Sequence, residues 1–225
     1  MVPLQKLKPR RLMSLFVKKV REYLLQRKLS NKDSRIELEK HWLKVKIIKH
    51  RNAQFIVKGK LKFSSFFEGN NPICIYLAEN AILQIDGDFS IGNGVQILVN
   101  MNGLLKIGGR SSEIESGFTC DSKILVNKSV EIGKDFACGW DVFITDCDWH
   151  YVEYDKNVVP NQADVTIGDH VWVAHGCSIL KGTKIGNGSV VGSKSLLTGK
   201  TYPANSLLAG TPAKVIKKNC NWKLS

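Results

Sequence analysis

Aliphatic residues recur at every sixth position between residues 165 and 201. They are Ile167, Val173, Ile179, Ile185, Val191 and Leu197. An α-helix cannot keep six-residue spacing on one face, and a single strand has a period of two. Three short strands joined by tight corners do accommodate this spacing, with one hexapeptide per side and about 18 residues per coil. The period therefore predicts a parallel β-helix shaped as a triangular prism, with these side chains stacked inside.

The same period predicts where the compact residues lie. Four positions after each aliphatic residue comes a small or compact side chain, in the order Val171, Cys177, Thr183, Ser189, Ser195 and Thr201. Glycine or alanine often follows the aliphatic residue directly, as at Gly168 and Ala174. We expect these residues at crowded corners, where φ is positive or where two backbones approach each other closely.

The period extends toward the N-terminus with interruptions. It begins at Ile85, slips between residues 100 and 116, and is restored from Cys120 to Ile144. We therefore expect a β-helix over residues 80–202, with roughly six coils. Lead-in strands over residues 31–79 would precede it. A C-terminal tail over residues 203–225 would leave the prism and pack along it.

One long insertion breaks the period. Ile144 and Ile167 are 23 positions apart instead of six, and residues 145–166 between them are polar and aromatic. A solenoid usually leaves its register to extend a loop on one face, and such loops often carry function. The insertion begins with the sequence Thr-Asp-Cys-Asp-Trp-His, so that two carboxylates, Asp146 and Asp148, come shortly before His150.

The positive charge is confined to the N-terminal quarter of the chain. Residues 1–30 hold nine Lys or Arg and one acid, a net charge of +8, and residues 31–60 hold nine and three, a net charge of +6. Because the whole chain carries +13, the remainder carries 13 − 14 = −1. A near-neutral main domain argues against nucleic acid as a partner.

Residues 1–30 include a predicted basic amphipathic helix. Its apolar residues recur at spacings of three and four between residues 11 and 29, and they are Leu12, Leu15, Phe16, Val20, Tyr23 and Leu24. One interpretation is that this helix lies on an anionic membrane surface. The other is that its apolar face packs on the body of the protein or on a neighbouring subunit.

The remaining composition indicates a cytoplasmic protein, peripheral on the inner face of the membrane if the first interpretation of the helix holds. Six cysteines are scattered without a CxxC pair or metal-ligand spacing, so we expect free thiols in a reducing compartment and no metal site. No apolar run reaches the ~18 residues that span a bilayer. No secretory signal is evident either, because Lys18 and Lys19 end the short apolar run near the N-terminus.

The hexapeptides, the insertion and the ending Ala-Gly-Thr-Pro-Ala-Lys at residues 209–214 resemble the left-handed β-helix acyltransferases, the hexapeptide-repeat family. The resemblance covers residues 80–218 and is strongest to O-acetyltransferases that act on sugars and on capsule or lipopolysaccharide glycans. It implies left-handed coiling, a homotrimer with active sites between adjacent prisms, and acetyl-coenzyme A as donor. The implied reaction is O-acetylation of a carbohydrate acceptor, a bacterial surface glycan or its precursor.

The resemblance also implies catalytic roles. The catalytic histidine of the family lies in a loop with a D-x-D-x-H-like sequence, which makes His150 the general base here. Asp148, or Asp146 as the alternative, would fix the tautomer of the imidazole and stabilise its protonated form. Trp172 would flank the active-site cleft, or would contact a neighbouring subunit.

The resemblance further implies a coenzyme A groove at one corner of the prism. Positions 18 apart occupy equivalent places in successive coils, and His175 and Ser193 are such a pair. The residues implied to line the pantetheine arm are Ala174, His175, Gly192 and Ser193. The residues implied to bind toward the nucleotide are Thr198, Lys200, Lys214, Lys217 and Lys218. The sequence departs from the family here, because Lys194 replaces a glycine and Gly199 moves Lys200 one place on.

Three other functions are left open. They are N-acetyl transfer to an amino sugar nucleotide, a non-catalytic trimeric scaffold, and a γ-type carbonic anhydrase. The last shares the prism and binds zinc through three histidines, which His150, His170 and His175 would have to supply. His170 comes three residues after Ile167 whereas His175 comes two after Val173, so these two do not occupy equivalent places.

Overall fold

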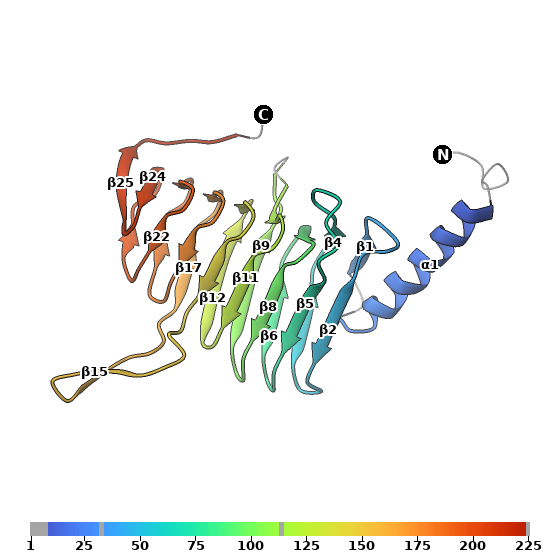
Figure 1. Cartoon of the computed structure of the whole chain (residues 1–225), viewed down its shortest axis with the longest axis horizontal. Helices are drawn as coiled ribbons and strands as arrows, with labels where there is room; N and C mark the ends of the chain where they lie inside the picture. Colours follow the sequence, from blue (N-terminus) through green and yellow to red (C-terminus); the bar gives the residue numbers. More distant parts are fainter. Residues whose placement is uncertain (1–8, 32–33, 113–114, 224–225) are drawn as a thin grey trace.

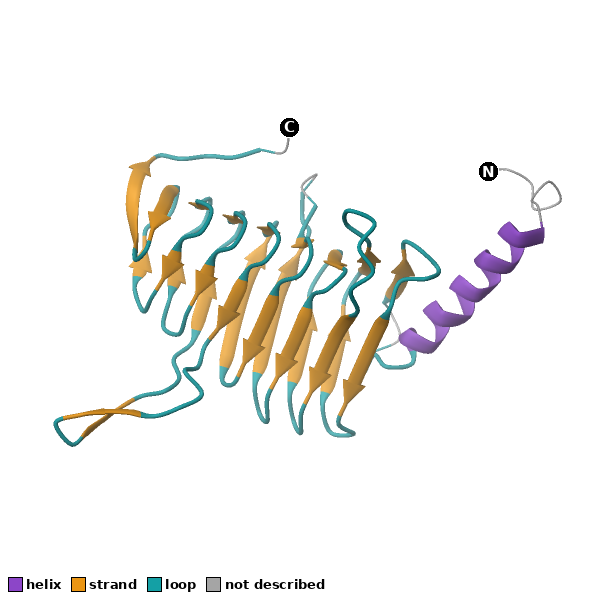
Figure 2. Cartoon of the chain, viewed as in Figure 1, coloured by secondary structure: helices purple, strands orange, loops and turns teal. Residues whose placement is uncertain are grey.

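The computed structural model describes residues 9–31, 34–112 and 115–223, and it is a triangular parallel β-helix with a helix at its N-terminal end (Figure 1). Three parallel sheets form the sides of the prism, and the chain visits them in a constant order (Figure 2). The predicted prism of stacked coils is therefore confirmed.

The three sheets, here called A, B and C, contain all but two of the described strands. Sheet A contains β1 (Arg35–Leu38), β4 (Lys60–Ser64), β7 (Phe89–Gly92), β10 (Gly117–Phe118), β13 (Ala137–Cys138), β18 (Trp172–Val173), β21 (Val190–Val191), β24 (Ser206–Gly210) and the antiparallel strand β25 (Ala213–Lys218). Sheet B contains β2 (Val45–Lys49), β5 (Ile73–Leu77), β8 (Gln96–Val99), β11 (Lys123–Val126), β14 (Phe143–Thr145), β19 (Ser178–Ile179) and β22 (Leu196–Leu197). Sheet C contains β3 (Gln54–Val57), β6 (Ile82–Ile85), β9 (Leu104–Gly109), β12 (Ser129–Lys134), β17 (Val165–Ile167), β20 (Lys184–Ile185) and β23 (Thr201–Tyr202). The segment that follows a sheet A strand forms the AB corner, and the BC and CA corners are named in the same way.

The strands alternate between buried and exposed residues because one face of each sheet lines the interior. The aliphatic residues at six-residue spacing, from Ile167 to Leu197, are each at most 3% exposed, so their predicted inward stacking is confirmed. The compact residues that follow them are also buried from Val171 to Ser195, whereas Thr201 is exposed.

The coils extend beyond the expected limits of residues 80–202 at both ends. The first strand of sheet A begins at Arg35, and the last parallel strand ends at Gly210. The N-terminal coils escaped the six-residue pattern because they are wider. Arg35 pairs with Lys60, a step of 25 residues, whereas the step between β18 and β21 is 18 residues. The additional residues lie at the corners, where they shift the phase of the period.

Side-chain oxygens at the CA corner join successive coils. Asp169 Oδ1 accepts the N–H of Lys134 at 2.7 Å, and Asn187 Oδ1 accepts the N–H of Asp169 at 2.9 Å. Each satisfies a backbone amide at the point where a strand ends. The glycine before each acceptor permits the close approach, because a Cβ on Gly168 would lie 2.7 Å from the backbone nitrogen of Asn187. This explains the recurring sequence Ile-Gly-Asp or Ile-Gly-Asn.

The helix α1 (Pro9–Gln26) covers the first strand of the prism. Glu22 Oε1 accepts the N–H of Leu38, and Gln26 Oε1 accepts the N–H of Ile36, both at 3.0 Å. These side chains lie one turn apart and bind alternate amides of β1, which protects the edge of sheet A. The helix thus meets the prism through polar side chains, and its apolar face does not pack on the body of its own chain. No helix in the described ranges has the length and apolar character needed to cross a membrane.

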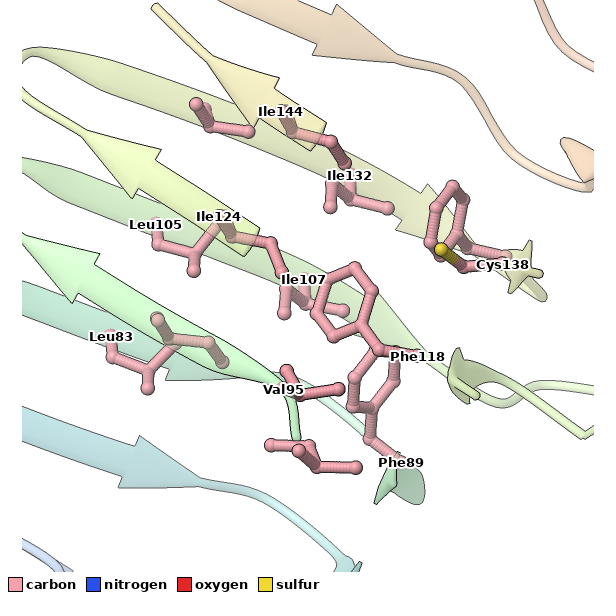
Figure 3. Packing of buried hydrophobic residues seen from close by; sticks show 14 of the residues in the cluster. Leu83, Phe89, Val95, Leu105, Ile107, Phe118, Ile124, Ile132, Cys138 and Ile144 are labelled. Carbon is pink, nitrogen blue, oxygen red and sulfur yellow. The ribbon is translucent and has the colours of Figure 1, made fainter. Parts of the chain in front are cut away.

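Three phenylalanines form a column inside the prism. The rings of Phe89 and Phe118 are 5.2 Å apart, those of Phe118 and Phe136 are 5.8 Å apart, and both pairs meet edge to face. All three side chains are at most 2% exposed. Figure 3 shows Phe89 and Phe118 pointing inward among the aliphatic side chains of neighbouring strands. The column fills the interior over three successive coils.

Replacing the central ring should test this packing. We expect Phe118→Ala to lower the free energy of unfolding by about 3–5 kcal/mol, because it removes a fully buried ring and leaves a cavity. Phe67→Ala is the matched control, since Phe67 is 78% exposed. Denaturant unfolding followed by circular dichroism measures both variants. Equal losses in the two variants would contradict the column as a major contributor to stability.

Candidate active site

The insertion leaves the prism at the BC corner as a β-hairpin. β15 (Val152–Tyr154) and β16 (Asn157–Val159) pair antiparallel, and the hairpin projects away from the prism on the side opposite the C-terminal segment (Figure 1). Its base is fixed, because the N–H of Asp148 donates to the carbonyl of Asn161 at 2.7 Å. A long polar hairpin held at its base is suited to carry a side chain away from its own prism.

His150 lies at the start of this hairpin. Its side chain is exposed, and no described residue is hydrogen-bonded to it. Trp149, directly before it, has a φ of 65°, so the chain turns sharply there. An exposed imidazole with both ring nitrogens free is available to accept a proton from an incoming hydroxyl group.

The two nearby carboxylates have partners other than His150. Asp146 is fully buried, and its oxygens accept the N–H groups of Asn127 at 2.8 Å and Lys128 at 2.7 Å. Asp148 forms an ion pair with Lys181, with 2.6 Å between Oδ2 and Nζ. Asp146 therefore holds the BC corner together, and Asp148 is the more exposed of the two. Within one chain, neither is hydrogen-bonded to His150.

The residues predicted to line the pantetheine arm lie at another corner. Ala174 and His175 follow β18, and Gly192 and Ser193 follow β21, which places all four at the AB corner. Val173 pairs with Val191, so His175 and Ser193 do occupy equivalent places in adjoining coils.

The sequence reasoning missed Trp140, which lies beside His175. The Nδ1 atom of His175 is 3.1 Å from the carbonyl oxygen of Trp140. Because a carbonyl only accepts, Nδ1 donates and Nε2 is left as the acceptor of this imidazole. The rings of Phe66 and Phe67 lie 6.3 and 5.9 Å from that of Trp140, so three exposed aromatic side chains gather at this corner. The 35-residue separation of Trp140 and His175, one coil of 18 plus the 17 residues added by the insertion, was the available signal.

The residues predicted for the nucleotide are divided. Thr198 and Lys200 follow β22 at the BC corner, on the same side as the hairpin. Lys214 and Lys217 are exposed on β25, at the C-terminal edge of sheet A. The predicted site residues thus fall into two groups within one chain. His150, Asp148, Thr198 and Lys200 lie at the BC corner, and the others lie at the AB corner or on sheet A.

Trp172 lies on the outer face of sheet A, where the C-terminal segment reaches it. It is 40% exposed, and its ring is 6.1 Å from that of Trp222. Trp222 stacks on His170 with 4.4 Å between ring centroids. Its Nε1 donates to the carbonyl of His170 at 2.9 Å, and the Nε2 of His170 donates to the carbonyl of Trp222 at 3.1 Å. This reciprocal pair fixes the C-terminal segment beside Trp172.

The three histidines considered for a zinc site lie at three different corners. His150 is at the BC corner, His170 at the CA corner and His175 at the AB corner. Among the residues with described positions, no three metal-binding side chains converge. A single chain therefore does not assemble the three-histidine site that the carbonic anhydrase alternative requires.

The buried thiols are not suited to nucleophilic attack. All six cysteines are free, as predicted. Burial, with a contribution from Asp121, raises the pKa of the Cys120 thiol to about 11. Burial also raises the pKa of Cys138 far above its ordinary value. Both remain protonated at neutral pH, and the thiolate is the reactive form.

Comparison with known proteins gives a consistent picture. Residues 164–199 match the family model described as bacterial transferase hexapeptide (six repeats). The chain is 39% identical over 101 residues to a putative lipopolysaccharide biosynthesis O-acetyl transferase of Escherichia coli K12, covering 40% of this chain and 51% of that protein. It is 31% identical over 142 residues to a polysialic acid O-acetyltransferase of Escherichia coli O1:K1, covering 62% of this chain and 42% of that protein. The chain thus spans about half the length of these two relatives.

Two further matches extend over more of the chain. An uncharacterised protein encoded in the cps region of Klebsiella pneumoniae is 27% identical over 182 residues, which cover 80% of this chain and 79% of that protein. The crystal structure of the polysialic acid-specific acetyltransferase NeuO covers 87% of this chain and 91% of its own, with 22% identity and a TM-score of 0.43.

The pairing of Trp222 with His170 should control how firmly the C-terminal segment is held. We expect Trp222→Ala to release residues 219–223 and to speed tryptic cleavage after Lys217 and Lys218 by about tenfold, because a stacked ring and a buried hydrogen bond are lost. Trp140→Ala is the control, since it removes an indole at the other corner. Equal cleavage rates in Trp222→Ala and the wild type would show that this contact does not hold the segment.

Proposed function

Because the chain belongs to the left-handed β-helix acyltransferases of the hexapeptide-repeat family, we propose that it transfers an acetyl group from acetyl-coenzyme A to a sugar hydroxyl. The observation that carries this proposal is the exposed, unpartnered His150 on the hairpin that interrupts the hexapeptide coils. We propose a bacterial surface glycan or its precursor as the acceptor. Its support is that two relatives are named as O-acetyltransferases, one for lipopolysaccharide biosynthesis and one for polysialic acid.

His150 acts as the general base in this proposal. As the sugar oxygen attacks the thioester carbonyl, a free ring nitrogen of His150 takes the hydroxyl proton. The new C–O bond forms and the C–S bond breaks. The imidazolium then returns the proton to the departing thiolate, so the products are the acetyl ester and free coenzyme A. No acetyl-enzyme intermediate is needed.

The AB corner suits a pantetheine arm. Its outer surface is built from small residues in successive coils, namely Gly139, Ala174 and Gly192. A Cβ at Gly139 would lie 2.8 Å from the backbone nitrogen of His175, so the coils are in close contact there and backbone groups form much of the wall. The exposed Lys194, Lys214 and Lys217 supply cations for the phosphates of the nucleotide end.

The division of the site between two corners supports a site shared by two copies. The hairpin of one chain would carry His150 to the AB corner of its neighbour, and a homotrimer would repeat this contact three times. An isolated two-stranded hairpin is at best marginally stable in water, which also favours a partner surface for it. Asp148 or a residue of the neighbouring chain would then orient the imidazole.

Removing the imidazole tests the base directly. We expect His150→Ala to lower the rate of acetyl transfer at least ~100-fold, within the usual range for loss of a general base. The melting temperature should not change, because the side chain is exposed and makes no described hydrogen bond. His50→Ala is the control, as it alters a histidine in the first coil. If His150→Ala retained full turnover while His175→Ala lost it, the base would be His175.

Mixing two inactive variants tests the shared site. His150→Ala lacks the base, and Ser193→Trp fills the proposed pantetheine groove with a large side chain. Co-expressed at equal levels, they should recover about a quarter of wild-type activity, since half of the hairpins and half of the grooves in each random trimer are intact. No recovery would mean that each site lies within one chain.

A further inference from the structure

The helix α1 presents an apolar stripe to solvent. The stripe comprises Met13, Phe16, Val20, Tyr23 and Leu24, which are 41% to 70% exposed. Their spacing of three and four residues places them on one face of the helix. Surface helices normally turn such a face to the core of their own protein. Here no described part of the chain covers it.

The opposite side of α1 is fastened to the prism. Glu22 and Gln26 bind the amides of β1, and the guanidinium of Arg21 donates to the carbonyl oxygens of His41 and Leu43. The helix cannot rotate to bury its apolar stripe without breaking these contacts.

The carboxylate of Glu22 is held in its charged form. Burial raises its pKa, but hydrogen bonds from Lys19 and from the N–H of Leu38 outweigh burial, so the pKa lies below its ordinary value. The contact of α1 with the prism therefore persists at neutral pH, and it weakens only when the pH falls through this lowered pKa.

Basic side chains accompany the stripe. Arg10, Arg27 and Lys28 are exposed, and in the described part of the chain none of them has an acidic partner. The first 30 residues carry a net charge of +8, and the chain after residue 60 carries −1. The apolar surface thus lies within a field of uncompensated positive charge, which selects an anionic partner.

A second copy of the helix is the less favourable occupant. It would bring a second cluster of +8 against the first, and the near-neutral prism offers no opposite charge. An anionic bilayer surface offers an apolar region for the stripe and acidic headgroups for the flanking cations. We propose that α1 binds the surface of an anionic membrane, lying in the plane of the interface with its stripe in the acyl boundary.

This inference is independent of the proposed catalytic activity. α1 lies at one end of the prism, and the hairpin and β25 lie toward the other (Figure 1). Membrane binding through α1 would therefore leave the hexapeptide end of the prism free to meet its substrates. The chain would act on acceptors that are themselves held at, or made at, the same surface.

Vesicle co-sedimentation tests the proposal with the full-length protein. We expect the protein to pellet with phosphatidylcholine vesicles that contain phosphatidylglycerol, and not with phosphatidylcholine vesicles alone. The double variant F16S/V20S removes apolar contacts from the stripe and should reduce pelleting at least about tenfold. Salt at about 0.5 M should also weaken binding, because it screens the headgroup charge.

The control is Met101→Ser, which replaces an apolar side chain that is 56% exposed on a turn of the prism, away from α1. It should pellet like the wild type. Failure of the wild type to bind the mixed vesicles, or equal binding by F16S/V20S, would overturn the proposal. A smaller assembly of F16S/V20S on a sizing column would overturn it as well, because it would assign the stripe to a second copy.

Discussion

The parallel stacking of coils is the constraint on which the rest of the molecule depends. Each strand is hydrogen-bonded to the strand of the coil before it and the coil after it, so no coil is stable alone. Stacking requires an inward side chain at fixed intervals and a corner that two backbones can share. The aliphatic residue and the Ile-Gly-Asp or Ile-Gly-Asn corner meet these two requirements, and Asp169 and Asn187 carry the hydrogen bonds from one coil to the next.

A prism of this kind has two open ends and must protect them. At the N-terminal end, Glu22 and Gln26 of α1 accept the amides of β1 that no coil is present to bind. At the C-terminal end, β25 turns back and pairs antiparallel with β24, and Trp222 then fastens the chain to His170. Both devices bring additional chemistry to the ends of the prism. The first leaves an apolar, basic helix face exposed, and the second places an indole beside Trp172.

Where the six-residue period was regular, the sequence was sufficient to predict the structure. The inward residues from Ile167 to Leu197 and the equivalence of His175 and Ser193 followed from counting. The coils before residue 80 did not, because corners of variable length shift the phase and no local rule fixes that length. Trp140 was hidden for a related reason, since the insertion separates it from His175 by 35 residues. Counting the sides would have shown that the hairpin and the AB corner are apart, since the insertion falls between β14 of sheet B and β17 of sheet C. The partner of Asp148 could not be counted, because it depends on how the hairpin folds back to Lys181.

The chemistry is thus expected where the regular stacking is interrupted, with the stacked coils as a rigid support for the hairpin that carries His150. The most direct measurement is the release of free thiol from acetyl-coenzyme A by the purified wild-type protein, followed with a panel of glycans and amino sugar nucleotides. Transfer to a sugar hydroxyl predicts thiol release that depends on a glycan acceptor and a product whose acetyl group is removed by mild alkali. Absence of thiol release with every acceptor, or an alkali-stable acetyl group on an amine, would contradict it.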